Sequence, residues 1–233
     1  MSEIIVPSKE IFIPKNYSIY IKPTENDISQ RKLEGYQRLA EIKQWGIKNP
    51  TKFMSIFLGV DLLDAQEYVF MNSWTKPFAL WLESRAAGKT TMLALYSMIK
   101  GLLFNNYRIY ICSGTADQSQ ETFKKIEDIA LKNIESMTGL TDVFKNEVEI
   151  SQSSSNGFIH NPMGFTYSLY NGSFVKTLNS NIDAKRGKRC ESVIFDEGGW
   201  LSEEVFNVIG AFTALNSNFK LGGDIDISAL PSE

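Results

Sequence analysis

The spacing of apolar residues predicts a helical region near the start of the chain. Apolar residues recur at three-residue steps between Asp27 and Trp45, which is the period of one helix face, and Gly46 then ends the pattern. Two more helices are expected, over residues 51–58 and 62–74. Residues 1–26, in which three prolines interrupt short apolar stretches, come before them. We therefore expect an N-terminal arm and a helical preface ahead of the core domain.

An alternation of strands and helices begins at Phe78–Leu82, a continuous apolar run of strand length. A helix over residues 89–104, a strand over 108–112 and a long helix over 116–137 follow it. Strands that alternate with helices usually form a parallel sheet, because the helices serve as the crossovers that parallel strands need. The first half of the core therefore predicts an α/β fold, with a mostly parallel central sheet and helices on both faces.

Residues 140–180 depart from this alternation. Short strands are expected over residues 148–150, 164–170 and 173–178. Beyond them, a strongly apolar strand over residues 191–197 ends in two acidic residues. A helix over 203–215 and a last strand over 224–227 complete the pattern. The sequence carries no internal repeat, so we expect one core domain to hold all of these elements.

Composition narrows the class of protein. Hydrophobic residues make up 43% of the chain, which suffices for a packed core and argues against disorder. The 24 basic and 27 acidic residues give a net charge of −3, which excludes a strongly basic nucleic-acid-binding arm but not a local basic groove. Two cysteines and one histidine exclude a disulfide scaffold and a two-histidine metal site. Without a membrane-length apolar run or a signal peptide, a cytoplasmic protein is expected.

The chief chemical signal is the stretch Glu83–Thr90, E-S-R-A-A-G-K-T, between a predicted strand and a predicted helix. A phosphate loop is G-x-x-x-x-G-K-[ST] in this same setting, and Glu83 replaces its first glycine. Backbone N–H groups at the helix start can surround phosphates, Lys89 can reach the β- and γ-phosphates, and the Thr90 hydroxyl can bind Mg²⁺. The alternative is a chance Gly-Lys-Thr at a helix start, which the flanking elements disfavour.

A second signal is the Asp196–Glu197 pair at the end of an apolar strand. Beside a phosphate loop, the first acid can hold Mg²⁺ and the second can orient and deprotonate a water molecule. The developing charge of phosphoryl transfer also needs a cation, and the candidates are Arg85 in the loop and Arg186 and Arg189 before the strand. The alternatives are acids that solvate a strand end and a solvated basic turn.

These residues resemble the sequence motifs of a known protein family. Ser84–Thr90 resembles the phosphate loop of phage large terminase subunits, the ATPases that pump DNA into empty capsids. Such loops typically follow S-R-x-x-G-K-[ST] without the first glycine, so the departure at Glu83 agrees with the resemblance. Other stretches resemble further motifs of that family in order over about residues 49–231. They are residues 49–59, 63–66, 109–114 with Gln118 and Gln120, 186–187, 193–197 (Walker B), and 227–229 with Pro231.

The resemblance implies a site for ATP and Mg²⁺, the expected cofactors. Gln66 would contact adenine, whereas the alternative for this residue by itself is an exposed helix glutamine. Thr90 and Asp196 hold the Mg²⁺. The residues expected to bind ATP are Gln66, Ser84, Arg85, Ala86, Ala87, Gly88, Lys89, Thr90 and Thr91.

The resemblance also implies how these residues act. Glu197 activates the attacking water, Arg85 acts in its own site, and Arg186 acts on the nucleotide of a neighbouring subunit. Ser228 and Ala229 lie in the small-residue coupling motif that links hydrolysis to DNA movement. Judged by itself, Ser228 could instead cap a strand end, as many serines do.

The fold implied is a RecA-like (ASCE) P-loop ATPase, with an N-terminal arm and helix over residues 1–48 and the ATPase domain over 49–233. The nuclease domain of full-length large terminases is absent from the chain, so no DNA cleavage is expected. The implied function is that of a motor that packages double-stranded DNA. Its implied partners are a portal protein, a small terminase subunit and further copies of itself in a ring, expected to be a pentamer. It would work in the host bacterial cytoplasm, at the portal of the procapsid.

Other functions share part of this signal. A helicase-like ATPase that remodels nucleic acid has the same phosphate loop and acidic strand, but it needs a second motor domain. A nucleotide-binding assembly module without turnover in isolation is a second alternative, because an arginine that acts in trans needs a neighbour. A metabolite kinase is the least favoured, since the sequence carries no lid or acceptor-pocket signature.

Overall fold

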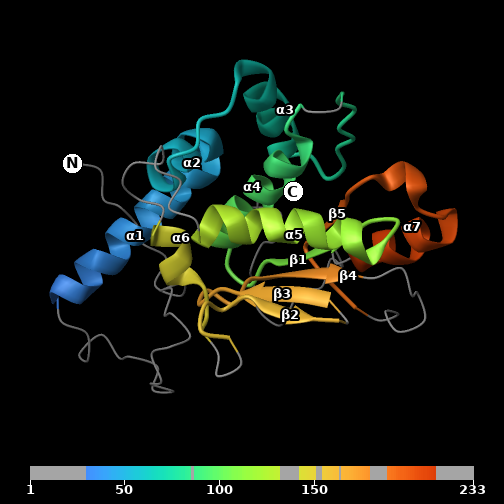
Figure 1. Ribbon diagram of the computed structural model, residues 1–233. Coiled ribbons are helices and arrows are strands. Elements are labelled where there is room, and N and C mark those ends of the chain that lie inside the picture. The colour runs from blue at the N-terminus through green and yellow to red at the C-terminus, as the bar shows by residue number, and fades with distance from the viewer. Residues whose placement is uncertain are drawn as a thin grey trace, which may run out of the picture.

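The chain was analysed as a computed structural model (Figure 1). The residues that the structure describes are 30–84, 87–131, 142–150, 154–162, 164–178 and 188–213. None of the helices in these ranges combines the length and the apolar character that a membrane crossing requires.

The helical preface is confirmed. It consists of α1 (Gln30–Lys48), α2 (Pro50–Leu58) and α3 (Asp64–Trp74). Pro50 occupies the first position of α2, where its missing N–H costs no hydrogen bond, and Gly59 ends the helix with a φ of 64°. The predicted domain boundary after residue 48 coincides with the end of α1, and the division into two units stays a prediction.

The helix–strand–helix core that follows is also confirmed. It runs through α4 (Lys89–Leu103), β1 (Arg108–Cys112) and α5 (Ala116–Leu131). Most of α4 is buried, as expected for a helix that packs against both the sheet and the preface. One side chain joins these layers, because the buried Lys100 Nζ donates a hydrogen bond of 3.1 Å to the Trp74 carbonyl at the end of α3.

The strand predicted before the phosphate loop is wrong in this structure. Residues 78–82 are not assigned to a strand and do not pair with the sheet. Three alternate side chains, Phe78, Leu80 and Leu82, are 70–85% exposed, whereas Trp81 donates to Ser73 Oγ of α3. An apolar run forms a strand only where a neighbour pairs with its backbone. The predicted strand 224–227 lies outside the described residues.

The sheet has five strands in the order β2-β3-β4-β1-β5. Its members are β1, β2 (Ile159–Asn161), β3 (Gly164–Ser168), β4 (Phe174–Leu178) and β5 (Ser192–Phe195). β1 pairs in parallel with both β4 and β5, whereas β2, β3 and β4 pair antiparallel. The sheet is therefore mixed, which corrects the expectation of a mostly parallel one. The reason is local, because the connections within residues 159–178 are too short for the crossover that parallel strands need.

Other element predictions differ in detail. Residues 148–150 form no strand, and Val148 makes only an isolated bridge to Leu169. The sequence did not indicate the short helix α6 (Asp142–Glu147) or the strand β2. The last predicted helix is shorter than expected, with α7 over Glu203–Gly210 and a 3₁₀ turn after it.

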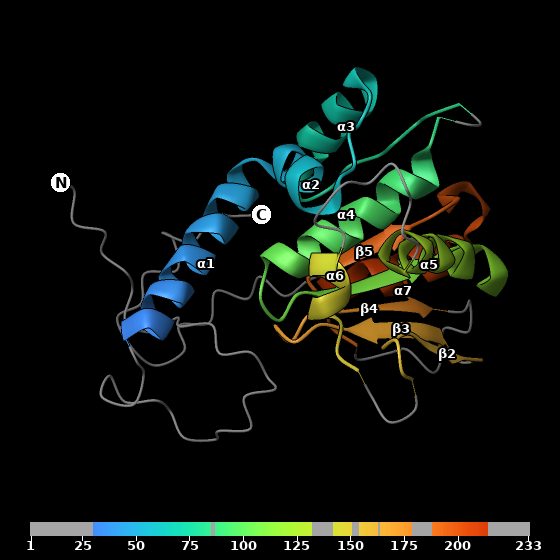
Figure 2. The same ribbon diagram turned by 60° about the vertical axis from the view of Figure 1, so that its left-hand side comes forward.

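Helices cover both faces of the sheet, as predicted. Alternate residues of β1 point to opposite sides, so that Ile109 and Ile111 belong to a core with α4 and α5, while Tyr110 and Cys112 belong to a second core with α7. Figures 1 and 2 show α4 and α5 together on one side of the strands. The carboxyl ends of the parallel strands β1 and β5 thus lie between two helical layers.

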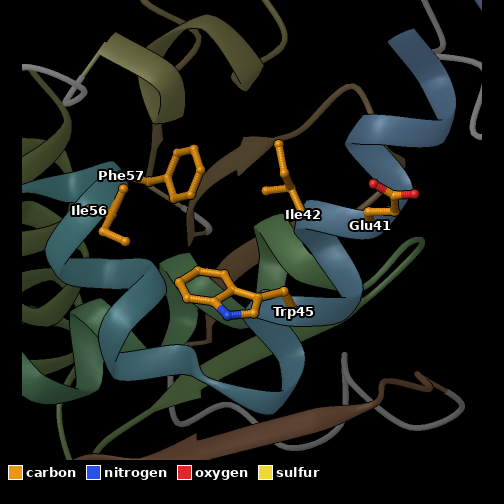
Figure 3. A pocket seen from close by; sticks show the side chains of 5 residues that line it. All are labelled: Glu41, Ile42, Trp45, Ile56 and Phe57. Atoms are coloured by element: carbon orange, nitrogen blue, oxygen red, sulfur yellow. The ribbon is translucent and has the colours of Figure 1, made fainter. Parts of the chain in front are cut away.

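A separate apolar groove lies between α1 and α2. Its volume is about 370 Å³, and it is lined by Glu41, Ile42, Trp45, Ile56 and Phe57. Figure 3 shows the apolar side chains of the two helices facing each other across it. None of the residues predicted to bind nucleotide lines this groove.

Candidate nucleotide site

The phosphate loop turns directly into α4. Ala87 N donates to Ser84 O across a turn at 3.4 Å, and Gly88 is the residue before the helix. Gly88 has a φ of +85°, which L side chains rarely adopt, and a Cβ at this position would lie 2.8 Å from Gln66 Nε2. The backbone conformation therefore favours glycine, whereas a Cβ would mainly displace the end of the Gln66 side chain. The loop presents the N-terminus of a 15-residue helix, whose dipole favours an anion.

Gln66, predicted to contact adenine, lies against this loop. Its Nε2 donates to Ala87 O at 2.8 Å, and its Oε1 accepts from Leu63 N at 3.1 Å. The side chain therefore ties the start of α3 to the residue before Gly88. One amide hydrogen and one lone pair remain available on Gln66, because a carboxamide has two donors and two acceptor sites.

The lysine of the phosphate loop lies close to the turn that follows β5. This turn carries Asp196 and Glu197 and is called the acidic turn below. Lys89 Nζ lies 4.0 Å from Glu197 Oε1, although the two residues are far apart in the sequence. The side chains are 29% and 49% exposed, so both charged groups are accessible from solvent. The first turn of α4 and the turn after β5 therefore form the two sides of one site.

The two neighbouring acids have opposite environments. Asp196 is 5% exposed, its N–H donates to Cys112 O at 2.9 Å, and its Oδ2 accepts from Thr122 Oγ1 at 2.5 Å. Glu197 is turned toward Lys89 and solvent. The two acids follow the end of β5 at Phe195, and the left-handed conformation of Glu197, rather than the period of the strand, turns its side chain away from that of Asp196.

Glu197 adopts an uncommon backbone conformation. Its φ of 54° and ψ of 43° lie in the left-handed region, and Asn106 is the only other non-glycine residue with positive φ in the described ranges. Such a conformation costs of the order of 1–3 kcal/mol and persists only where surrounding contacts impose it. Here the following 3₁₀ turn contributes, because Trp200 N donates to Glu197 O at 3.0 Å. Such strain often accompanies a functional residue.

The remaining predicted residues divide into two groups. Thr90 and Thr91 lie partly buried in the first turn of α4, and Ser84 is exposed. The positions outside the described residues are Arg85, Ala86, Arg186, Ser228 and Ala229. Arg189 is described and exposed. Within the described ranges, no three His, Cys, Asp or Glu side chains gather into a metal-binding group.

Thr122 is a residue that the sequence reasoning missed. It lies on α5, is fully buried and donates to Asp196, one of the two acids singled out from the sequence. The sequence carries only a weak indication of a role for Thr122. The residue precedes Phe123, where a row of apolar residues at helical spacing begins on α5. A buried hydroxyl beside such a stripe needs a hydrogen-bond partner, but the sequence does not say which one.

Of the comparisons with known proteins, only the one with solved structures bears on the fold. No family model matches the sequence, and no curated protein matches it. Among solved structures, the ATPase domain of the large terminase of Thermus phage P74-26 is similar, with a TM-score of 0.50 and 16% sequence identity. The match covers 70% of this chain and 64% of that one, so the chain spans less than two thirds of the solved protein's length. At this identity the likeness shows the fold alone, and it is the fold that the resemblance of the phosphate loop led us to expect.

Proposed function

We propose that this chain is the ATP-hydrolysing motor domain of a viral DNA-packaging terminase. The observation that carries the proposal is the 4.0 Å approach of Lys89 Nζ to Glu197 Oε1. A phosphate-loop lysine and an acid at the end of a neighbouring sheet strand form the pair expected for phosphoryl transfer to water. The fold match to a terminase ATPase domain supports the same function.

The phosphates of ATP are proposed to bind at the start of α4. Gly88 leaves room for close approach of the backbone, and the helix N-terminus attracts negative charge. The backbone of residues 86–89 and the hydroxyls of Thr90 and Thr91 would surround the phosphates, with Ser84 and Arg85 at the loop's beginning. The remaining amide hydrogen and lone pair of Gln66 are proposed to hydrogen-bond to the adenine ring.

Mg²⁺ is proposed to bind between Thr90 and Asp196. Their hydroxyl and carboxylate oxygens are donors that suit this ion, which commonly takes one or two protein ligands together with phosphates and water. When bound, the ion supplies positive charge that neutralises the phosphate oxygens. The burial of Asp196 beside β1 fits a carboxylate kept in one orientation.

Glu197 is proposed to orient a water molecule and to accept its proton. The left-handed turn at this residue directs the carboxylate out of the sheet, toward Lys89. Lys89 would hold the β- and γ-phosphates, and Arg85 would stabilise the charge that develops on them. Arg186 is proposed to act on the nucleotide of a neighbouring subunit.

The wider role follows from the resemblance of the sequence motifs. Hydrolysis would be coupled through Ser228 and Ala229 to the translocation of double-stranded DNA into a procapsid. The partners would be the portal protein, the small terminase subunit and further copies of the chain in a ring, expected to be a pentamer. The place of action would be the host cytoplasm, at the portal.

Turnover as a function of protein concentration tests this proposal. If an arginine acts in trans, the ATPase rate per subunit should rise steeply as subunits assemble. The control is Lys89→Met, which should remain inactive at every concentration. A rate per subunit that is independent of concentration would contradict the ring motor. No turnover at any concentration, with ATP still bound, would favour a passive nucleotide-binding module instead.

A further inference from the structure

A polar ridge on α5 faces the acidic turn. Gln118 and Thr122 are one helical turn apart, so their side chains lie on the same face of the helix. Thr122 contacts Asp196, and Gln118 Oε1 lies near Gly114, beside Trp200 of the acidic turn. Gln118 Oε1 is buried and has no hydrogen-bond partner among the described residues. The N-terminal half of α5 therefore lines the candidate site from a direction that the motifs do not indicate.

Thr122 makes a hydrogen bond that fixes a carboxylate. A threonine within a helix can donate its single hydroxyl hydrogen to the carbonyl one turn back, yet this hydroxyl donates to Asp196 Oδ2 at 2.5 Å. Both partners are buried, so water does not compete for the bond. The structure gives no hydrogen bond to Oδ1 among the residues that it describes. One oxygen of Asp196 is thus held, and the other remains for a further ligand.

The helix that carries Thr122 is itself firmly packed. Phe123 is fully buried, and its ring lies 5.9 Å from that of Phe158 and 5.8 Å from that of Tyr167. Further along α5, Glu127 Oε2 lies 2.7 Å from His160 Nε2 of β2. These contacts fix the rotation of α5 against the sheet, so the position of the Thr122 hydroxyl is set by the core rather than by a loop.

We infer that Thr122 is a positioning residue for the metal-binding carboxylate of Asp196. This inference rests on the proposed function, because it assumes that Asp196 holds Mg²⁺. Thr122 keeps Oδ2 in place and so directs Oδ1 toward the ion and its water shell. Outer partners of this kind typically change metal affinity by about 10- to 100-fold when they are removed.

The test compares Thr122→Val with Thr122→Ser. Valine keeps the shape of the side chain but cannot donate, whereas serine keeps the hydroxyl. Binding of a fluorescent ATP analogue is titrated with Mg²⁺, and the same analogue is titrated in EDTA. The valine variant should need about tenfold more Mg²⁺ for half-maximal binding, with its EDTA affinity unchanged. The serine variant should behave like the wild type.

A matched control removes the same kind of bond elsewhere. Thr51 Oγ1 donates to Glu67 Oε1 at 2.7 Å, between α2 and α3. Thr51→Val should lower the melting temperature slightly and leave the Mg²⁺ requirement unchanged. If Thr122→Val does not fold, Thr122→Ala tests the same loss of the donor with a smaller side chain.

A second readout needs neither metal nor nucleotide. In EDTA, the melting temperatures of Thr122→Val, Asp196→Ala and the double variant form a cycle that reports whether the two side chains are coupled. The shifts should not add, because each single change already breaks the shared bond. Additive shifts, or an unchanged Mg²⁺ requirement in Thr122→Val, would overturn the inference while the proposed function stands. A wild type that binds no Mg²⁺–nucleotide would overturn the proposed function, and the inference with it.

Discussion

The two sides of the candidate site are fixed in different ways. On the acidic side, the turn after β5 is held by a main-chain bond to β1, by Thr122 of α5 and by the 3₁₀ turn that follows. On the phosphate-loop side, residues 78–84 pair with no described strand. Trp81 donates to Ser73 Oγ, and the loop itself is held by the bonds of Ala87, whose N–H donates to Ser84 O and whose carbonyl accepts from Gln66.

We therefore expect the two sides of the site to govern different steps of the reaction. The acidic side is positioned by the core, so changes there should affect the chemical step or the metal while nucleotide binding persists. The loop side depends on a few local contacts, so changes there should affect nucleotide affinity first. Substitutions on each side test this difference.

The largest effect is expected on the acidic side, from Glu197→Gln. Glutamine keeps the size of the side chain but cannot accept the proton, and a general base typically contributes about 10²- to 10⁴-fold. Steady-state turnover should fall by about 10³-fold, while ATP affinity measured by calorimetry stays within a few-fold of the wild type. Glu203→Gln, an exposed acid at the start of α7, is the matched control. Normal turnover in the Glu197 variant would refute the assignment of the base.

A smaller effect is expected on the loop side, from Gly88→Ala. The left-handed conformation costs an alanine roughly 1–2 kcal/mol, and its methyl group would also press on Gln66 Nε2. ATP should bind about tenfold more weakly, because about 1.4 kcal/mol corresponds to a factor of ten. Gly210→Ala is the control, since a Cβ there meets no atom within 4 Å and the backbone is helical. Equal ATP affinity in both variants would show that the loop does not need the observed conformation.

The smallest effect is expected from Gln66→Ala. It removes the bond to Ala87 O, and a net hydrogen bond contributes of the order of 1 kcal/mol. Nucleotide affinity should therefore fall about fivefold, with the turnover rate at saturating ATP nearly unchanged. Gln44→Ala, an exposed position of α1, serves as the reference. A similar loss for ATP and GTP would assign Gln66 to holding the loop, whereas a loss confined to ATP would assign it to adenine.

Much of the fold could be predicted from local patterns. The helices α1 to α5 and the strands β1, β4 and β5 lie close to where periodicity places them. The core elements α4, α5 and β1 bury an apolar face of the right period, whereas α1 leaves Leu39, Ile42 and Trp45 exposed. The absence of a strand at Phe78–Leu82 could not be predicted in this way. An apolar run can form a strand, but whether a partner pairs with it depends on distant parts of the chain.

The candidate site also combines residues that local sequence predicts with contacts that depend on distant parts of the chain. The motif predicts Gly88 and Lys89 as neighbours on a helix start, and the apolar strand predicts the positions of Asp196 and Glu197. Their approach across the site depends on strand order, which no single segment specifies. Thr122 could not be assigned a role at all, since its partner Asp196 follows β5, far along the sequence, and only the packed structure brings the two together.

A crystal structure with a non-hydrolysable ATP analogue and Mg²⁺ would show whether Lys89 and Glu197 serve one triphosphate. The expected result is Lys89 Nζ within hydrogen-bond distance of the β- or γ-phosphate, with the Glu197 carboxylate facing the γ-phosphate across a water molecule. A nucleotide bound elsewhere, or phosphates on Lys89 with Glu197 turned away into a separate contact, would contradict the account.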